Sequence, residues 1–349
     1  MVDFLVEGGR RSVRPSIVQV MMTGTNAKYD ADINTLNTLV EEILQDHRAN
    51  PPEKPDLVQV MLTGRDKETG LGMSDQNIRG NLLTFLIAGH ETTSGMLTFA
   101  TYFILKNPET YRKLREEIDT KIGDRSMTPH DVGKLPYLLA VMRETLRLGP
   151  TAPARSIYAS EDTVIGGKYA VEKGVSVLVN LCTVMRDPKV WGEDADQFRP
   201  ERMLDGKFEA LPPNAWQPFG FGMRGCIGRP FAWQEAQIAL VTILQHFDLV
   251  MDDPSYELKV KQTLTIKPDE FYIHALPRKD KPRLLSVPSS AVLPDLRAAA
   301  AADAGKGQNG TASATADASG LQPLFVLYGS NTGSSKSFAE RLAADAPMH

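Results

Sequence analysis

Apolar residues recur at helical spacing over most of the first two thirds of the chain. Between Ile33 and Ile43 they lie three or four positions apart, which predicts an amphipathic helix. A longer helix is predicted over about residues 74–106, because its apolar run follows Ser74, a residue type that suits an N-cap. A helix over about 136–148 is predicted by the same spacing.

Proline and glycine mark where further helices begin and end. Pro108 directly follows Asn107 and fits the first position of a helix, and Gly123 fits the position just past its end. A last strong helical run is predicted over about 230–247. Helices therefore dominate this part of the chain.

Shorter segments between the helices alternate apolar and polar residues. A hairpin is predicted over 162–171, with its turn at Gly166 and Gly167, and a further strand is predicted over 175–181. Short strands are also predicted around 258–273. The predicted fold class is therefore mainly α with small β sheets.

Composition excludes several classes of protein. The 349 residues include 39 Lys and Arg against 43 Asp and Glu, a formal net charge of −4, which gives no reason to expect a nucleic acid or an anionic membrane as partner. Two cysteines, Cys182 and Cys226, are too few for a disulfide framework or a zinc site built from cysteine. The sequence shows no signal peptide and no run near the ~18 apolar residues of a membrane span, so a cytoplasmic location is expected.

One abrupt change of composition predicts a linker. Residues 295–320 are rich in alanine and glycine and lack aromatic residues, so they bury too little apolar surface to offset the entropy of ordering. A short alanine-rich helix over 295–304 is the alternative. We divide the chain into a first domain at 1–290, a flexible linker at 291–321 and a second unit at 322–349.

The surroundings of Cys226 carry the candidate chemistry. A lone cysteine is commonly a small buried hydrophobe. Cys226, however, follows a glycine-rich loop and precedes a helix, whose N-terminal partial positive charge stabilises a thiolate. Arg224 adds a cation that can pair with a carboxylate. Such a thiolate suits a metal whose other ligands belong to a cofactor, and haem iron with one axial cysteine is that case.

This loop resembles the haem-binding signature of the cytochrome P450 monooxygenases. Its five fixed positions are occupied by Phe219, Gly222, Arg224, Cys226 and Gly228. The resemblance implies that Cys226 ligates the haem iron, that Arg224 pairs with a haem propionate, and that Phe219 packs near the sulfur. Gly228 completes the predicted haem-binding set.

A second motif is similar to the structural triad of the same family. Glu144 and Arg147 lie three positions apart, hence on one helix face. An isolated pair of this kind is usually a solvated surface pair. The stretch 198–202 resembles the family segment that completes the triad, and this implies that Arg202 is its third member.

A third motif interrupts the long helix with polar and small residues. Burying the carboxylate of Glu91 without a purpose would cost several kcal/mol. Ala88 and Thr92 share one face, so a flat cofactor could approach closely, and Thr92 could bond back to the carbonyl of Ala88 and locally open the helix. The motif resembles the oxygen-activating motif of the family, which implies that Glu91 and Thr92 are catalytic.

The C-terminal unit has a loop of small and hydroxyl residues between a predicted strand and helix. The loop holds Ser330, Asn331, Thr332, Gly333 and Ser334, whose backbone N–H and hydroxyl groups could bind an anion. A plain strand-to-helix turn is the alternative. Behind a haem-thiolate domain, the loop resembles the FMN-phosphate loop of a flavodoxin-like reductase domain, here only its first strand and helix.

The combined resemblance is to self-sufficient fusions of a cytochrome P450 with its NADPH–P450 reductase. It implies a monooxygenase that hydroxylates a fatty acid or similar aliphatic substrate with O2, using haem b and electrons that pass from NADPH through FAD and FMN. The chain is expected to be a fragment truncated at both ends. Two alternatives stay open: a protein that binds haem without turnover, and a fragment without function.

Overall fold

The computed structural model describes residues 2–281 of the chain. The predicted linker at 291–321, its alternative alanine-rich helix and the predicted second unit at 322–349 lie outside the described residues. The described part consists mainly of helices, with four small two-stranded sheets. The predicted fold class, mainly α with small β sheets, is therefore confirmed for this part of the chain.

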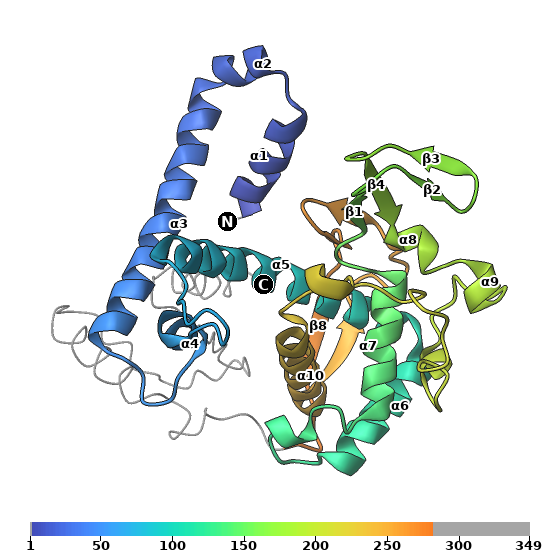
Figure 1. Ribbon diagram of the computed structural model, residues 1–349. Coiled ribbons are helices and arrows are strands. Elements are labelled where there is room, and N and C mark those ends of the chain that lie inside the picture. Colours follow the sequence, from blue (N-terminus) through green and yellow to red (C-terminus); the bar gives the residue numbers. More distant parts are fainter. Residues whose placement is uncertain (1, 282–349) are drawn as a thin grey trace. The chain divides into compact units, whose positions relative to one another are not determined.

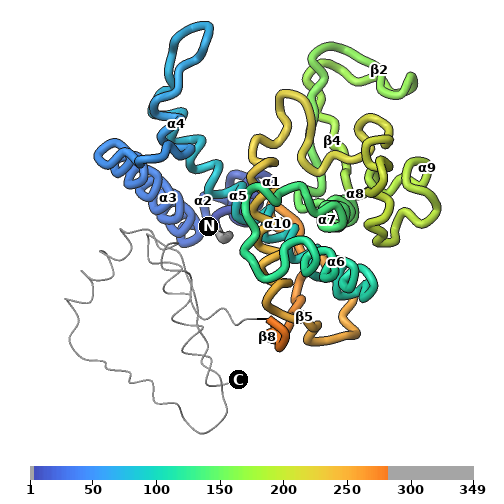
Figure 2. Tube along the Cα trace, turned by 90° about the horizontal axis from the view of Figure 1, so that it is seen from below, coloured from blue at the N-terminus to red at the C-terminus, as the bar shows by residue number. Residues whose placement is uncertain are grey.

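The long helix α5 (Asp75–Lys106) packs along both of its halves (Figures 1 and 2). Its first half contributes to a cluster with helices α3 and α4, made of Val40, Leu44, Met61, Ile78 and Leu82. Its second half enters a larger core with helices α6, α7 and α10, in which the contacts of α5 are Met96, Ala100 and Ile104. The helix is apolar on nearly all sides there because neighbours surround it.

The other helices have well-defined bounds. The remaining α-helices are α1 (Val2–Val13), α2 (Ser16–Met21), α3 (Thr23–Ala49), α4 (Leu57–Thr63), α6 (Pro108–Lys121), α7 (Pro136–Leu148), α8 (Leu181–Val184), α9 (Pro188–Trp191) and α10 (Arg229–His246). Short 3-10 turns are η1 (Pro129–Asp131), η2 (Pro200–Met203) and η3 (Gly222–Arg224).

The strands form antiparallel pairs only. Their bounds are β1 (Ala154–Tyr158), β2 (Thr163–Ile165), β3 (Tyr169–Val171), β4 (Ser176–Asn180), β5 (Phe247–Met251), β6 (Val260–Gln262), β7 (Ile266–Pro268) and β8 (Ile273–Pro277). The pairs are β1 with β4, β2 with β3, β5 with β8, and β6 with β7. In the last pair Lys261 lies opposite Lys267.

Local sequence signals set several of these boundaries as predicted. The hydroxyl of Ser74 accepts a hydrogen bond from the backbone N–H of Asn77 at 3.3 Å, which caps α5. Pro108 is the first residue of α6, and Gly123 follows its end with a φ of +64°. Both turn glycines of the β2–β3 hairpin also have positive φ.

Other features differ from the prediction. Helices α1 and α2 and strand β1 were not predicted. The strand expected over 175–181 ends at Asn180, because the side chain of Asn180 accepts a hydrogen bond from the N–H of Thr183 and starts α8. Among the described helices, none combines the length and the apolar character that crossing a membrane requires.

Candidate functional site

The loop before α10 presents the sulfur of Cys226 at the surface of the described chain. The N–H of Cys226 donates to the carbonyl of Phe219 at 2.8 Å, and the N–H of Gly225 donates to the carbonyl of Gly222 at 3.0 Å. Gly220 and Gly222 have φ of +69° and +62°, a conformation that favours glycine. The resulting turn leaves Cys226 exposed, so its interpretation as a small buried hydrophobe is wrong.

Aromatic residues support this loop from behind. The ring of Phe219 lies 5.7 Å from that of Trp233 and 6.2 Å from that of Trp216, centroid to centroid. The guanidinium of Arg229 lies 5.7 Å from the Phe219 ring and 5.8 Å from the Trp216 ring. These contacts fix the loop against α10.

Two predicted site residues flank the sulfur. A Cβ added at Gly228 would lie 3.8 Å from the Cys226 sulfur, an ordinary van der Waals distance, so Gly228 borders the thiol. Arg224, at the end of η3, is exposed and forms no ion pair with any described residue. Its charge is therefore available to an anionic group from outside the chain.

Arg155 belongs to the same site, although sequence reasoning missed it. It lies on β1, and its guanidinium is 4.3 Å from the ring centroid of Phe221 in the cysteine loop. Its Nε atom is buried and has no hydrogen-bond partner among the described residues. In the sequence, Arg155 is a lone arginine two residues after Pro153. Because strand β1 was not predicted, no pattern placed this arginine beside the cysteine loop.

Exposed apolar side chains lie within and just after the loop that holds the thiol. They are Phe221 (51% exposed), Met223 (102%), Ile227 (82%) and Phe231 (68%). Such an apolar cluster on a protein surface marks a binding site. A thiol, an apolar surface and two arginines without acidic partners fit the haem group that the signature implies, since haem combines an iron atom, a flat apolar ring and two carboxylates.

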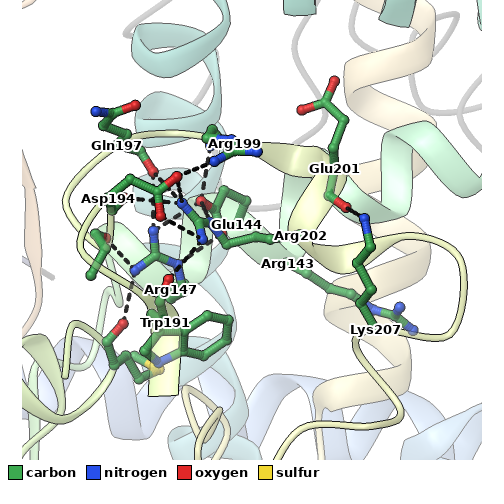
Figure 3. A network of polar contacts seen from close by, with 12 residues as sticks. Arg143, Glu144, Arg147, Trp191, Asp194, Gln197, Arg199, Glu201, Arg202 and Lys207 are labelled. Atoms are coloured by element: carbon green, nitrogen blue, oxygen red, sulfur yellow. Dashed lines mark hydrogen bonds and ion pairs between the residues drawn. The ribbon is translucent and has the colours of Figure 1, made fainter. Parts of the chain in front are cut away.

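Glu144 and Arg147 of the predicted triad are buried, Arg202 is partly exposed, and all three are paired (Figure 3). Arg147 donates to Glu144 through Nε and Nη2, at 2.8 and 2.9 Å, and both side chains have 0% exposure. Arg202 donates its Nε to Glu144 Oε1 at 2.9 Å. The alternative of a solvated surface pair is therefore wrong.

The triad also holds the chain segment that follows it. Arg147 donates to the carbonyls of Met185 and Ala195, at 3.0 and 2.6 Å. Asp194 pairs with both Arg199 and Arg202 (Figure 3), and the hydrogen bond from Arg199 lowers the pKa of the Asp194 carboxyl. These bonds fix the backbone on both sides of α9, and the part after α9 leads through η2 toward the cysteine loop.

Glu91 lies in the middle of α5 and is buried, with 3% exposure. Its Oε1 atom accepts a hydrogen bond from the hydroxyl of Thr263 at 2.6 Å, and the Nζ atom of Lys267 lies 3.8 Å away. Its Oε2 atom has no hydrogen-bond partner among the described residues. The carboxylate therefore faces the β6–β7 hairpin.

Thr92 makes the back-bond that the sequence predicts. Its hydroxyl donates to the carbonyl of Ala88 at 2.7 Å. The helix is nevertheless continuous there, so the prediction of a local opening is wrong: the bond is accommodated within the regular helix. Ala88 is exposed and Thr92 is partly exposed, so this helix face is accessible, whereas Glu91 points elsewhere.

The predicted FMN-phosphate loop, Ser330 to Ser334, lies outside the described residues. The predicted haem-binding residues Phe219, Arg224, Cys226 and Gly228 lie in one loop, and Arg155 of β1 lies against that loop. Glu91 and Thr92 are neighbours on α5 but share no hydrogen bond.

Comparison with known proteins agrees with this geometry. The Cytochrome P450 family profile matches residues 11–275. The chain is 56% identical over 347 residues to a self-sufficient cytochrome P450 monooxygenase of Phanerodontia chrysosporium. It is 49% and 45% identical to bifunctional cytochrome P450/NADPH–P450 reductases of Aspergillus oryzae and Fusarium oxysporum, over 358 and 356 residues.

These alignments cover 99–100% of this chain but only 32–33% of each relative. The chain therefore spans about a third of the length of the curated relatives it matches. The resemblance that the cysteine loop indicates is confirmed, and the chain belongs to the cytochrome P450 family.

Proposed function

We propose that this chain carries the oxygen-inserting site of a haem-thiolate monooxygenase of the self-sufficient type. One observation supports this most directly: the exposed Cys226 shares its loop with exposed apolar side chains, and Arg155, which contacts Phe221 of that loop, has a buried Nε atom without a hydrogen-bond partner among the described residues. Haem would bring its iron to the sulfur, its flat apolar ring to the apolar side chains and a carboxylate to Arg155. The family membership and the names of the relatives agree with the proposal.

The residues around Cys226 would hold the haem. Cys226 would bind the haem iron through its sulfur, and Arg224 and Arg155 would pair with the propionates. Phe219 would keep the sulfur loop rigid through its contacts with Trp216 and Trp233. When bound, haem supplies the activation of O2 and the transfer of one oxygen atom, while the protein orients and shields the site.

On the helix α5, Ala88 would lie against the flat cofactor, because its side chain is small and its position is exposed. Thr92 and Glu91 would move protons toward O2, with Thr92 holding a water and Glu91 supplying the proton. The proposed substrate is a fatty acid or a similar aliphatic molecule. In the complete protein, electrons would pass from NADPH through FAD and FMN, and Ser330 to Ser334 would bind the FMN phosphate.

A second candidate function is haem binding without turnover. The observation that favours it is the orientation of Glu91, whose carboxylate faces the β6–β7 hairpin and shares no hydrogen bond with Thr92. Product formation distinguishes it from the monooxygenase. The haem-loaded chain would be supplied with a separate NADPH–P450 reductase and a fatty acid, and hydroxylated product would support the first proposal.

The haem site itself is tested by spectroscopy. The reduced chain with carbon monoxide is expected to show the red-shifted Soret band of thiolate ligation. Cys226→Ser should lose that band, whereas Cys182→Ser, a change of the other cysteine, should keep it. Retention of the band by Cys226→Ser would show that the ligand is assigned wrongly.

A further inference from the structure

The β6–β7 hairpin packs closely against the middle of α5. A Cβ added at Gly95, one turn after Glu91, would meet the side chain of Thr151 at 2.9 Å and the carbonyl of Ile266 at 3.3 Å. The N–H of Ile266 donates to the carbonyl of Thr151 at 2.9 Å. The absence of a side chain at residue 95 thus lets the hairpin approach the helix at the level of Glu91.

Two buried polar atoms in this contact lack partners. They are Oε2 of Glu91 and the hydroxyl of Thr265, neither of which has a hydrogen bond to any described residue. Thr265 is 4% exposed and Glu91 3%. Thr263 connects the two residues, because its hydroxyl donates to Glu91 Oε1 at 2.6 Å while its N–H donates to the Thr265 carbonyl at 2.8 Å. Burying a donor or an acceptor without a hydrogen-bond partner is unfavourable.

A water molecule is a partner that each of these atoms could bind. Buried waters in proteins typically make about three hydrogen bonds to polar groups that otherwise lack partners. A carboxylate oxygen accepts one such bond, and the threonine hydroxyl can donate or accept another. The contact is therefore chemically suited to hold water within the protein.

Lys267 joins this buried contact to the solvent. Its side chain is 31% exposed, and its Nζ atom lies 3.8 Å from Oε1 of Glu91. That distance is too long for a direct hydrogen bond and suits an intervening water. Lys267 forms no other ion pair among the described residues.

We propose that protons from solvent reach Glu91 through Lys267 and a water held between Glu91 and Thr265. An N–H bond of the Lys267 ammonium breaks as a proton passes to the water, and the water passes a proton to Glu91 Oε2. The neutral amine then takes a proton from bulk solvent. Lys267 does not contact the reacting atoms and acts by supplying protons to Glu91. This inference rests on the proposed role of Glu91 and Thr92.

The first test is a crystal structure of the full chain and of its Thr265→Val variant. We expect a water within hydrogen-bond distance of Glu91 Oε2 and Thr265 Oγ1, and its loss in the variant, which keeps the shape of the side chain but lacks the hydroxyl. A direct bond between those two atoms, or no water there, would overturn the proposal. This test does not require turnover. It therefore shows whether the water site exists even if the chain binds haem without forming product.

The second test measures product formed per NADPH consumed by the haem-loaded chain with a separate reductase. Lys267→Met should lower this ratio at least about tenfold. Lys267→Arg should lower it as much, because arginine keeps the charge but does not give up its proton in proteins. The carbon monoxide band and the KM for the substrate should not change, whereas a merely structural role would disturb them.

Lys261→Met is the matched control, since Lys261 lies opposite Lys267 on the hairpin and pairs with Asp269 at 3.8 Å instead. A normal ratio in Lys267→Met, or rescue by Lys267→Arg, would overturn the proposal. Glu91→Gln and Thr92→Ala distinguish a failure of the proposed supply route from a failure of the proposed relay. If these two uncouple the reaction and the Lys267 variants do not, only the supply route is wrong; if neither uncouples it, the proposed relay itself is wrong.

Discussion

Arg147 holds Glu144 by two hydrogen bonds, of 2.8 and 2.9 Å, and neither side chain is exposed to solvent. Arg202 adds a third bond to the same carboxylate at 2.9 Å. Two cations therefore share one buried anion, and their remaining N–H groups donate to backbone carbonyls of the segment that precedes the cysteine loop. Glu144 is therefore the only acidic side chain that pairs with Arg147 among the described residues, and Arg202 also pairs with Asp194.

Glu144→Leu should strongly destabilise the chain. The substitution leaves the buried guanidinium of Arg147 without its anion, and breaking a buried pair in this way typically costs about 3–5 kcal/mol. Urea unfolding followed by circular dichroism measures the change. Glu109→Leu is the control, because Glu109 pairs with Arg112 at the exposed surface and its loss should change the midpoint little. Equal midpoints for the two variants would contradict the prediction.

Stability should also depend on the protonation of His47. Burial of the ring disfavours its charged form, but the hydrogen bonds to Asp56 and to the carbonyl of Ile43 outweigh this and raise the pKa of His47 above 6.5. A group whose pKa is higher in the folded state stabilises the fold fully below its unfolded pKa. That contribution is lost as the pH rises through the folded pKa.

The urea midpoint of the wild-type chain should therefore fall relative to that of His47→Gln between about pH 6 and pH 9. His130→Gln is the matched control, because His130 is exposed in the short turn η1. A pH dependence that is the same in the wild type and in His47→Gln would show that this pair does not contribute.

Arg155→Gln should weaken haem retention without unfolding the chain. Its buried Nε atom has no hydrogen-bond partner within residues 2–281, and a charge-assisted hydrogen bond is worth about 1.5–3 kcal/mol, or roughly 10- to 100-fold in affinity. Transfer of haem to apomyoglobin measures the rate of loss. Lys168→Gln, at the exposed turn of the neighbouring hairpin, is the control for the change of charge. Unchanged transfer from Arg155→Gln would remove Arg155 from the site.

Residue patterns that act within one helix made much of the fold predictable. Contacts between residues far apart in the sequence could not be predicted in this way. Ser74, Pro108 and Gly123 act on their own helices, so their roles follow from the sequence. The bond between Thr263 and Glu91 joins residues 172 positions apart, and no local pattern reports it. Arg155 was missed for the same reason, because its significance depends on the approach of β1 to the cysteine loop.

The last prediction concerns Thr92. Proton delivery to O2 in an apolar pocket requires a group that can hold a water, and the Thr92 hydroxyl, bonded to the carbonyl of Ala88 at 2.7 Å, is such a group on the accessible face of α5. Thr92→Ala should keep the carbon monoxide band, since haem ligation does not use the hydroxyl. Product per NADPH should fall while peroxide rises, because help of this kind is typically worth about 10²–10⁴ in rate.

Thr98→Ala is the closest control for Thr92→Ala, because the Thr98 hydroxyl makes the same back-bond on the same helix, to the carbonyl of Ser94 at 2.8 Å. Thr93→Ala tests the neighbouring residue. Thr93 points about 100° away from Thr92 around the helix axis and is buried, with 5% exposure. Thr93→Ala removes a buried methyl group. It should therefore lower the free energy of unfolding and leave the product formed per NADPH unchanged. If Thr92→Ala gave normal product per NADPH while Thr93→Ala released peroxide, the relay would run through Thr93, and the accessible face of α5 would have a different role.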